Sequence, residues 1–201
     1  MTDHHDDSQQ KSSSAEFARR YVDRLIRVLR RLDYEAVDRV IDLFLDARSR
    51  GNAIFFLGNG GSAATADHFA NDLGVCASPE GIIPFRAISL TSNSALITCL
   101  GNDLGYEYIF SGQLRSLMRP GDVVVGISAS GNSPNAVKAL EYAAENGGIA
   151  VALVGFDGGI MKNIASHVIH IETEKGEYGP VEDVHMVLDH LISTYLTLIA
   201  K

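Results

Sequence analysis

Two short loops rich in glycine, serine and asparagine contain the residues of this sequence that are best suited to bind an anion. Residues 58–62 read GNGGS, and residues 128–134 read SASGNSP. Glycine lets the backbone turn tightly and approach a ligand, while serine hydroxyls and the N–H groups at a helix N-terminus bind phosphate. Ser62 and Pro134 are predicted to cap and to begin the helices that follow. Each loop alone is typical of an ordinary capped turn, but the two together favour a phosphorylated ligand.

Neither loop has the spacing of a common nucleotide-binding motif. The Walker motif is G-x-x-x-x-G-K-[ST], and the dinucleotide fingerprint is G-x-G-x-x-G. Both loops lack a lysine. The sequence therefore disfavours ATP and NAD as ligands.

A second group of residues has the chemistry of acid–base catalysis or metal binding. His68 and Asp72 are four residues apart, so on a helix their side chains share one face. In the last predicted helix, from Pro180 to about residue 201, Glu182 and His190 are predicted to lie opposite the apolar stripe. That stripe is predicted to comprise Val184, Leu188, Leu191, Tyr195 and Leu198.

The predicted stripe has a consequence for the assembly of these groups. A helix that buries one stripe cannot easily turn its opposite face towards His68 of the same domain. If the pairs His68/Asp72 and Glu182/His190 form one site, a neighbouring subunit is therefore predicted to supply one of them. On spacing alone, ordinary polar helix faces explain these residues equally well.

The elements that position these residues follow from the apolar pattern. Short apolar runs alternate with helix-length segments, which predicts βαβ units and a mainly parallel sheet buried on both faces. The predicted strands cover residues 53–57, 86–90, 122–127, 149–154 and 168–172. Ligands of such sheets bind beyond the carboxyl ends of the strands, where both loops lie.

The domain organisation is predicted from the same pattern. Apolar residues at helical spacing predict two helices between residue 15 and about residue 50. We expect one domain over residues 15–201, with N-terminal helices at 15–50 and an α/β core at 51–201. Residues 1–14 are expected to form a disordered polar tail, in which His4 and His5 favour a frayed terminus over a metal site.

Composition excludes several classes of protein. The chain has 201 residues, with 25 acidic and 17 basic side chains and a formal net charge of −8, which argues against a general nucleic-acid binder. Residues 1–14 lack the apolar core of a signal peptide, and no apolar run elsewhere is long enough for a membrane span, so a cytoplasmic protein is expected. Cys76 and Cys99, in apolar sequence neighbourhoods, form neither a disulfide framework nor a metal motif. The arginine-rich first helix favours a solvated face over an acidic partner.

Six segments of the chain form a characteristic series. They read GNGGSA at 58–63, HFANDL at 68–73, GNDLGY at 101–106, GDVVVGISASGNSPN at 121–135, GFDGG at 155–159 and VEDVHMVLDH at 181–190. In this order they resemble the phosphoheptose isomerases of the sugar-isomerase (SIS) superfamily. The two serine- and glycine-rich loops mark the superfamily in general, whereas His68 and His190 mark the heptose branch.

The resemblance implies a cytoplasmic homotetramer of flavodoxin-like SIS domains. Each would be a three-layer α/β sandwich with a five-stranded sheet, and the active sites would lie between subunits. The implied reaction converts sedoheptulose 7-phosphate to D-glycero-D-manno-heptose 7-phosphate through an enediol.

The same resemblance implies roles for individual residues. By similarity, the zinc ligands correspond to His68, Asp72, Glu182 and His190, with Asp72 as the base and His190 as the acid. The residues that would line the substrate are Asn59, Gly60, Gly61, Ser62, Asp72, Asn102, Asp103, Ser128, Ala129, Ser130, Ser133 and Glu182. A carboxylate, an imidazole and a Lewis-acid metal suit proton transfer beside a carbonyl.

Four positions depart from the pattern of that family. Asp72 stands in place of the usual glutamate and Glu182 in place of glutamine, while Ala129 replaces threonine and Gly179 an aspartate that is often present. The shorter Asp72 would shift a general base by about an ångström, which costs roughly a hundredfold in rate.

Two alternatives to the heptose isomerase therefore stay open. One is a noncatalytic SIS protein that binds a phosphosugar or a protein partner, like the replication-initiation regulator of this superfamily, and the other is an isomerase of a different ketose phosphate.

Overall fold

The N-terminal part of the chain forms two helices, as predicted. The computed structural model describes residues 13–78 and 80–200, so residues 1–12 of the tail predicted at 1–14, with His4 and His5, lie outside the described residues. Helix α1 (Ser14–Leu29) begins where the Ser13 side chain accepts a hydrogen bond from the Glu16 N–H, and α2 (Tyr34–Arg50) ends at Gly51 in the left-handed conformation. Asp33 caps α2 by accepting from the Ala36 N–H at 3.0 Å.

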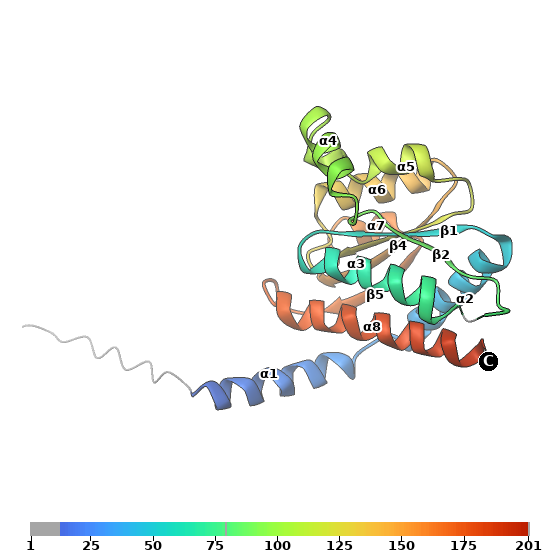
Figure 1. The fold of residues 1–201 in the computed structure, drawn as a ribbon. Coiled ribbons are helices and arrows are strands. Elements are labelled where there is room, and N and C mark those ends of the chain that lie inside the picture. Colours follow the sequence, from blue (N-terminus) through green and yellow to red (C-terminus); the bar gives the residue numbers. More distant parts are fainter. Residues whose placement is uncertain (1–12, 79, 201) are drawn as a thin grey trace, which may run out of the picture.

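Helix α1 lies along the last helix, α8 (Tyr178–Ile199), at the outside of the fold (Figure 1). Val28 is its one buried residue, and most of its arginines are exposed, which agrees with the predicted solvated face. Arg24 is an exception, because its guanidinium donates two hydrogen bonds to Glu177 at 2.5 and 2.7 Å. This contact lowers the pKa of the Glu177 carboxyl to about 2. The paired charges hold α1 against the start of α8.

A five-stranded, entirely parallel sheet forms the centre of the described chain. The strands are β1 (Ala53–Gly58), β2 (Arg86–Ser89), β3 (Val123–Ser128), β4 (Ile149–Phe156) and β5 (His167–Glu172), in the order β2-β1-β3-β4-β5. Every residue of β1 and β3 is buried, as the continuous apolar runs predict for strands covered on both faces. The strand order reverses between β1 and β3, which is where open α/β sheets bind their ligands.

Helices cover both faces of the sheet and complete the predicted three-layer sandwich (Figure 1). One layer contains α2, α8 and α3 (Gly61–Asn71), which continues into a turn of π-helix at Asp72–Cys76. The other contains α4 (Ser94–Asp103), a 3₁₀ turn (Tyr106–Tyr108), α5 (Ser111–Leu117), α6 (Pro134–Glu145) and α7 (Met161–Ile164). In the described part of the chain, no helix has the length and apolar character that a membrane crossing requires. Cys76 and Cys99 are free and exposed.

The buried face of α8 differs from the predicted one. Its buried apolar residues are Val181, Val184, Leu188, Ile192 and Leu196. Leu191, Tyr195 and Leu198, which the sequence pattern places in the core, are 37%, 46% and 60% exposed. The predicted stripe was right for Val184 and Leu188 but wrong for these three residues, because α8 is apolar on two sides and hydrophobicity alone does not distinguish the side that packs on the sheet. The actual rotation turns part of the polar residues of α8 towards α3.

Candidate active site

The first loop leads from β1 into α3 through a backbone conformation that suits glycine. Gly60 has φ +54° and is the N-cap of α3, which begins at Gly61. The predicted capping role of Ser62 was wrong, because Ser62 lies inside the first turn and is buried, and no described side chain caps this helix. An uncapped N-terminus leaves backbone N–H groups available to an anion.

The second loop is held by hydrogen bonds among its own residues. The Ser128 hydroxyl accepts from the Gly131 N–H at 3.1 Å and lies 3.5 and 3.3 Å from the hydroxyls of Ser130 and Ser133. Gly131 has φ +63°, and a Cβ there would collide with the carbonyl oxygen of Gly158. Pro134 occupies the first turn of α6, as predicted. The loop is thus closely folded around a cluster of three hydroxyl groups.

Both loops line a single cavity of about 200 Å³ at the β1/β3 switch point. Its lining residues are Asn59, Ser62, Ile127, Ser128, Ala129, Ser130, Ser133, Tyr178 and Glu182. Seven of these are among the substrate-lining residues that the sequence predicts, and Gly60 and Gly61 lie between Asn59 and Ser62 in the first loop. Tyr178 was missed, since nothing in its local sequence marks the start of α8 as part of a binding site. Hydroxyl groups and a helix N-terminus give the cavity the character of a phosphate site.

Asn59 connects the two loops as well as lining the cavity. Its side-chain amide exchanges two hydrogen bonds with that of Asn135 in α6, both at 2.8 Å. Tyr106 donates a further hydrogen bond to the Asn59 carbonyl oxygen at 3.0 Å. Asn135 is buried and was not identified from the sequence as a site residue. This amide pair fixes the spacing between the loops on which the cavity depends.

Asn102 and Asp103 are not brought to this cavity. They lie at the end of α4, are exposed, and form a hydrogen bond with each other at 2.8 Å. Of the segment 101–106, the Tyr106 hydroxyl is the group that reaches Asn59. Within one subunit, Asn102 and Asp103 therefore do not contribute to the phosphate cavity.

The histidine and carboxylate side chains of α3 and α8 meet within one chain. Ligand atoms of His68, Asp72, Asp189 and His190 all lie within 4.8 Å of one another. The rings of His68 and His190 have centroids 4.9 Å apart at an interplanar angle of 82°, and His68 Nε2 is 3.6 Å from Asp72 Oδ1. The expectation that α8 could not turn His190 towards His68 of the same domain was therefore wrong. The predicted stripe placed the polar face of α8 on the opposite side from α3.

Asp72 is positioned by the change from α-helix to π-helix at the end of α3. It is the first residue of the π-helical turn, a feature that is frequent at functional sites. The Asn71 side chain donates to Asp72 Oδ1 at 3.1 Å, and the Ser193 hydroxyl donates to Oδ2 at 3.4 Å. Each carboxylate oxygen of Asp72 thus has a hydrogen-bond donor.

Asp189 was not identified from the sequence, although it directly precedes His190. Its side chain is fully buried, and neither carboxylate oxygen has a hydrogen-bond partner among the described residues. Burial, and to a lesser degree the nearby charge of Asp72, raises the pKa of this carboxyl to about 7. Two imidazoles and two carboxylates match the ligands that Zn²⁺ accepts, so the residues present fit a zinc ion.

Glu182 lies apart from this group. It precedes His190 by eight positions in α8, which is about 12 Å along the helix axis. Its carboxylate lies against Gly61, where a Cβ would collide with it, and it lines the phosphate cavity. The structure therefore places the predicted ligand Glu182 at the phosphate cavity and not among His68, Asp72 and His190.

The chain is similar to known proteins over most of its length. The profile of the SIS domain family matches residues 18–155. A protein of Thermoplasma acidophilum named "probable phosphoheptose isomerase" is 35% identical over 175 residues, which cover 87% of this chain and 94% of that relative. The phosphoheptose isomerase of Geotalea daltonii is 41% identical over 156 residues, covering 76% and 80% of the two chains.

A solved structure agrees with these relatives. The phosphoheptose isomerase GmhA of Neisseria gonorrhoeae superposes with a TM-score of 0.82 at 30% identity, covering 92% of this chain and 98% of that one. The family profile, the sequence relatives and the solved structure all match this chain, which carries the loops 58–62 and 128–134 together with His68 and His190. The chain belongs to the phosphoheptose isomerase family of SIS-domain proteins.

Proposed function

We propose that this protein converts sedoheptulose 7-phosphate to D-glycero-D-manno-heptose 7-phosphate through an enediol. One observation carries the proposal. The cavity lined by the two loops and the group of histidines and carboxylates lie along the same helix, α3. Ser62 at the cavity and His68 in the group are six residues apart in α3, or about 9 Å along its axis. An extended chain of about eight bonds, from the phosphorus to C1 of a heptose, has about the same length. This distance favours a long phosphosugar over a short one.

The net charge of the protein does not attract the phosphate end of the substrate. The chain has a net charge of −8, and the cavity is lined by serines and by Glu182, with no lysine or arginine among its lining residues. Attraction must come from hydroxyl groups and from the N-termini of α3 and α6, whose backbone N–H groups and dipoles favour an anion. Glu182 faces the same cavity and is positioned to accept hydrogen bonds from sugar hydroxyls.

Asp72 and His190 are the proposed base and acid. Asp72 takes a proton from C1 of the ketose while His190 gives one to the C2 carbonyl oxygen, which yields the enediol. Return of a proton to C2 and loss of the proton on the C1 hydroxyl completes the aldose, so that no proton is gained or lost overall. We assign His68 and His190, together with a carboxylate of the same group, to hold a zinc ion, which supplies Lewis-acid polarisation of the sugar carbonyl when bound. Glu182 can join them only from a partner subunit, given its distance from His190.

Deuterium exchange tests this function directly. Zinc-loaded protein incubated with sedoheptulose 7-phosphate in heavy water is expected to give the aldose with deuterium at C2, detected by NMR. Bound phosphosugar with neither exchange nor aldose would instead identify a noncatalytic binding protein. Faster exchange with a pentulose or hexulose phosphate would identify an isomerase of a different substrate.

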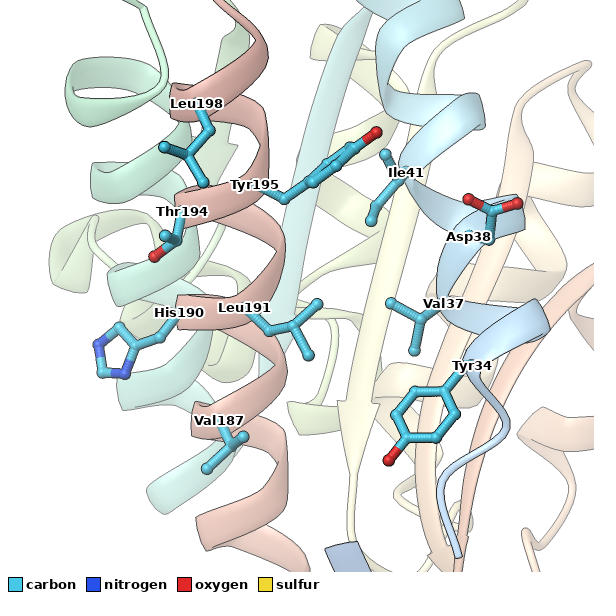
Figure 2. A pocket seen from close by; sticks show the side chains of 10 residues that line it. All are labelled: Tyr34, Val37, Asp38, Ile41, Val187, His190, Leu191, Thr194, Tyr195 and Leu198. Carbon is cyan, nitrogen blue, oxygen red and sulfur yellow. The ribbon is translucent and has the colours of Figure 1, made fainter. Parts of the chain in front are cut away.

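We further propose that the protein is a homotetramer and that an apolar groove between α2 and α8 is one of its interfaces. The groove has a volume of about 680 Å³, and its lining residues are Tyr34, Val37, Asp38, Ile41, Val187, His190, Leu191, Thr194, Tyr195 and Leu198. Figure 2 shows Leu191 and Tyr195 directed from α8 towards Val37 and Ile41 of α2, with His190 on the other side of α8. A second copy seated here would bury the exposed stripe of α8 and lie beside the catalytic group.

A charge placed in this groove is expected to dissociate the assembly. Leu191→Glu puts a carboxylate into the apolar contact, where an unpaired charge is costly to bury. Light scattering after gel filtration should show a smaller particle than for the unmodified protein. Leu117→Glu is the matched control, because Leu117 is also exposed but lies at the end of α5 in the opposite layer. An unchanged mass for Leu191→Glu would exclude the groove as an interface.

A further inference from the structure

A purely structural role does not explain the environment of the Asp189 carboxylate. Its carboxylate is fully buried, and both oxygens lack hydrogen-bond partners among the described residues. A buried carboxylate without partners costs free energy, whereas a leucine of similar size at the same place would not. The position therefore requires a group that compensates the carboxylate.

The neighbouring side chains of the same helix do not supply that compensation. His185 lies one turn earlier on α8 and is itself fully buried, with both ring nitrogens unpartnered among the described residues. Burial lowers the pKa of His185 to about 3, so this ring is neutral at neutral pH. Asp72, the charged group next to Asp189, repels it. A divalent cation would attract both carboxylates at once.

We propose that Asp189 is a direct metal ligand, which holds the ion together with His68 and His190 and leaves Asp72 free to act as the base. Ligand atoms of all four residues already lie within 4.8 Å of one another in a single subunit. A catalytic zinc ion needs three protein ligands and an open position, and two histidines with one carboxylate form such a set. This inference rests on the proposed metal-dependent function and assigns the ligands within it.

The hydrogen bonds around the two carboxylates support this division of roles. Asp72 accepts a hydrogen bond on each oxygen, from Asn71 and from Ser193, so its charge is stabilised by the protein itself. Asp189 has no such donor among the described residues. Asp189, which lacks protein partners, is the carboxylate that needs the metal, and Asp72, which is partly exposed and hydrogen-bonded, is the one that can exchange a proton. Glu182 is then left to the phosphate cavity.

Metal binding in the absence of any sugar tests the proposal. Zn²⁺ affinity is measured by competition with a chromophoric chelator for the unmodified protein, Asp189→Asn, Asp72→Asn and Glu182→Gln. Removal of a direct ligand should weaken Zn²⁺ binding more than removal of a residue that only contacts a ligand. Asp189→Asn is therefore expected to weaken binding by at least about 100-fold. Glu182→Gln should bind as the unmodified protein does, and Asp72→Asn should lose less than Asp189→Asn. The visible absorption of bound Co²⁺ should change in Asp189→Asn and stay the same in Glu182→Gln.

The thermal stability of the metal-free Asp189 variants distinguishes a metal ligand from a residue that the fold itself requires. Asp189→Asn and Asp189→Leu remove a buried, uncompensated carboxylate, so both should be at least as stable as the unmodified metal-free protein in thermal unfolding. Both should lose the increase in melting temperature that Zn²⁺ produces in the unmodified protein. Unchanged Zn²⁺ binding by Asp189→Asn, or failure of both variants to fold without metal, would overturn the proposal. Because no sugar is used, a negative result here leaves the isomerase activity to its own test.

Discussion

Replacing His190 by alanine is expected to lower the turnover of sedoheptulose 7-phosphate by about 10³-fold, the typical contribution of a positioned acid. The imidazole meets His68 and Asp72 at the contact between α3 and α8, so its removal takes away both the proposed acid and a proposed metal ligand. Binding of the phosphosugar should be largely retained, because the cavity lined by the loops 58–62 and 128–134 lies at the N-terminus of α3, whereas His190 lies near its C-terminus. Steady-state kinetics and calorimetric titration with the substrate measure the two quantities separately.

His167→Ala is the matched control for this variant. His167 begins β5, at the end of the sheet opposite to the strand ends that bear the loops, and its ring contacts Ser166. Turnover should be unaffected there. Equal turnover in His190→Ala and the unmodified protein would remove His190 from the mechanism.

Replacing Gly131 by alanine is expected to raise KM for the phosphosugar by about 10-fold or more and to destabilise the fold by about 2 kcal/mol. The residue has φ +63°, and an added Cβ would collide with the carbonyl oxygen of Gly158, a backbone atom that cannot rotate away. Relief of this collision must move the loop and disturb the hydrogen bond from the Gly131 N–H to Ser128. Kinetics and urea unfolding give the two effects.

Gly176→Ala separates backbone strain from the collision. Gly176 also has a positive φ, +101°, but a Cβ there would meet open space. We expect a small loss of stability and no change in KM. If Gly131→Ala behaved like Gly176→Ala, the close approach of the Gly131 and Gly158 backbones would have no part in phosphate binding.

The sequence predicts the architecture and the meeting of the two loops at one cavity, because both depend on local pattern. The apolar runs that form β1 and β3 are buried on both faces, and a parallel sheet is the arrangement that such runs permit. The loops after these strands are adjacent because parallel strands end at the same edge. The sequence therefore predicts that the serines of 128–133 lie close to Ser62, and in the structure they line one cavity.

The tertiary structure was needed to show which residues of α8 join His68 and Asp72. Helix α8 has two apolar sides, and the packing of Val184, Leu188 and Ile192 on the sheet set a rotation that hydrophobicity alone left undetermined. That rotation brings Asp189 and His190 to His68 and leaves Leu191 and Tyr195 exposed. The pairing of Asn59 with Asn135 and the distance of Asn102 from the cavity were likewise beyond prediction. Local periodicity specifies which faces a helix has, whereas the face it buries depends on contacts with residues far away in the chain.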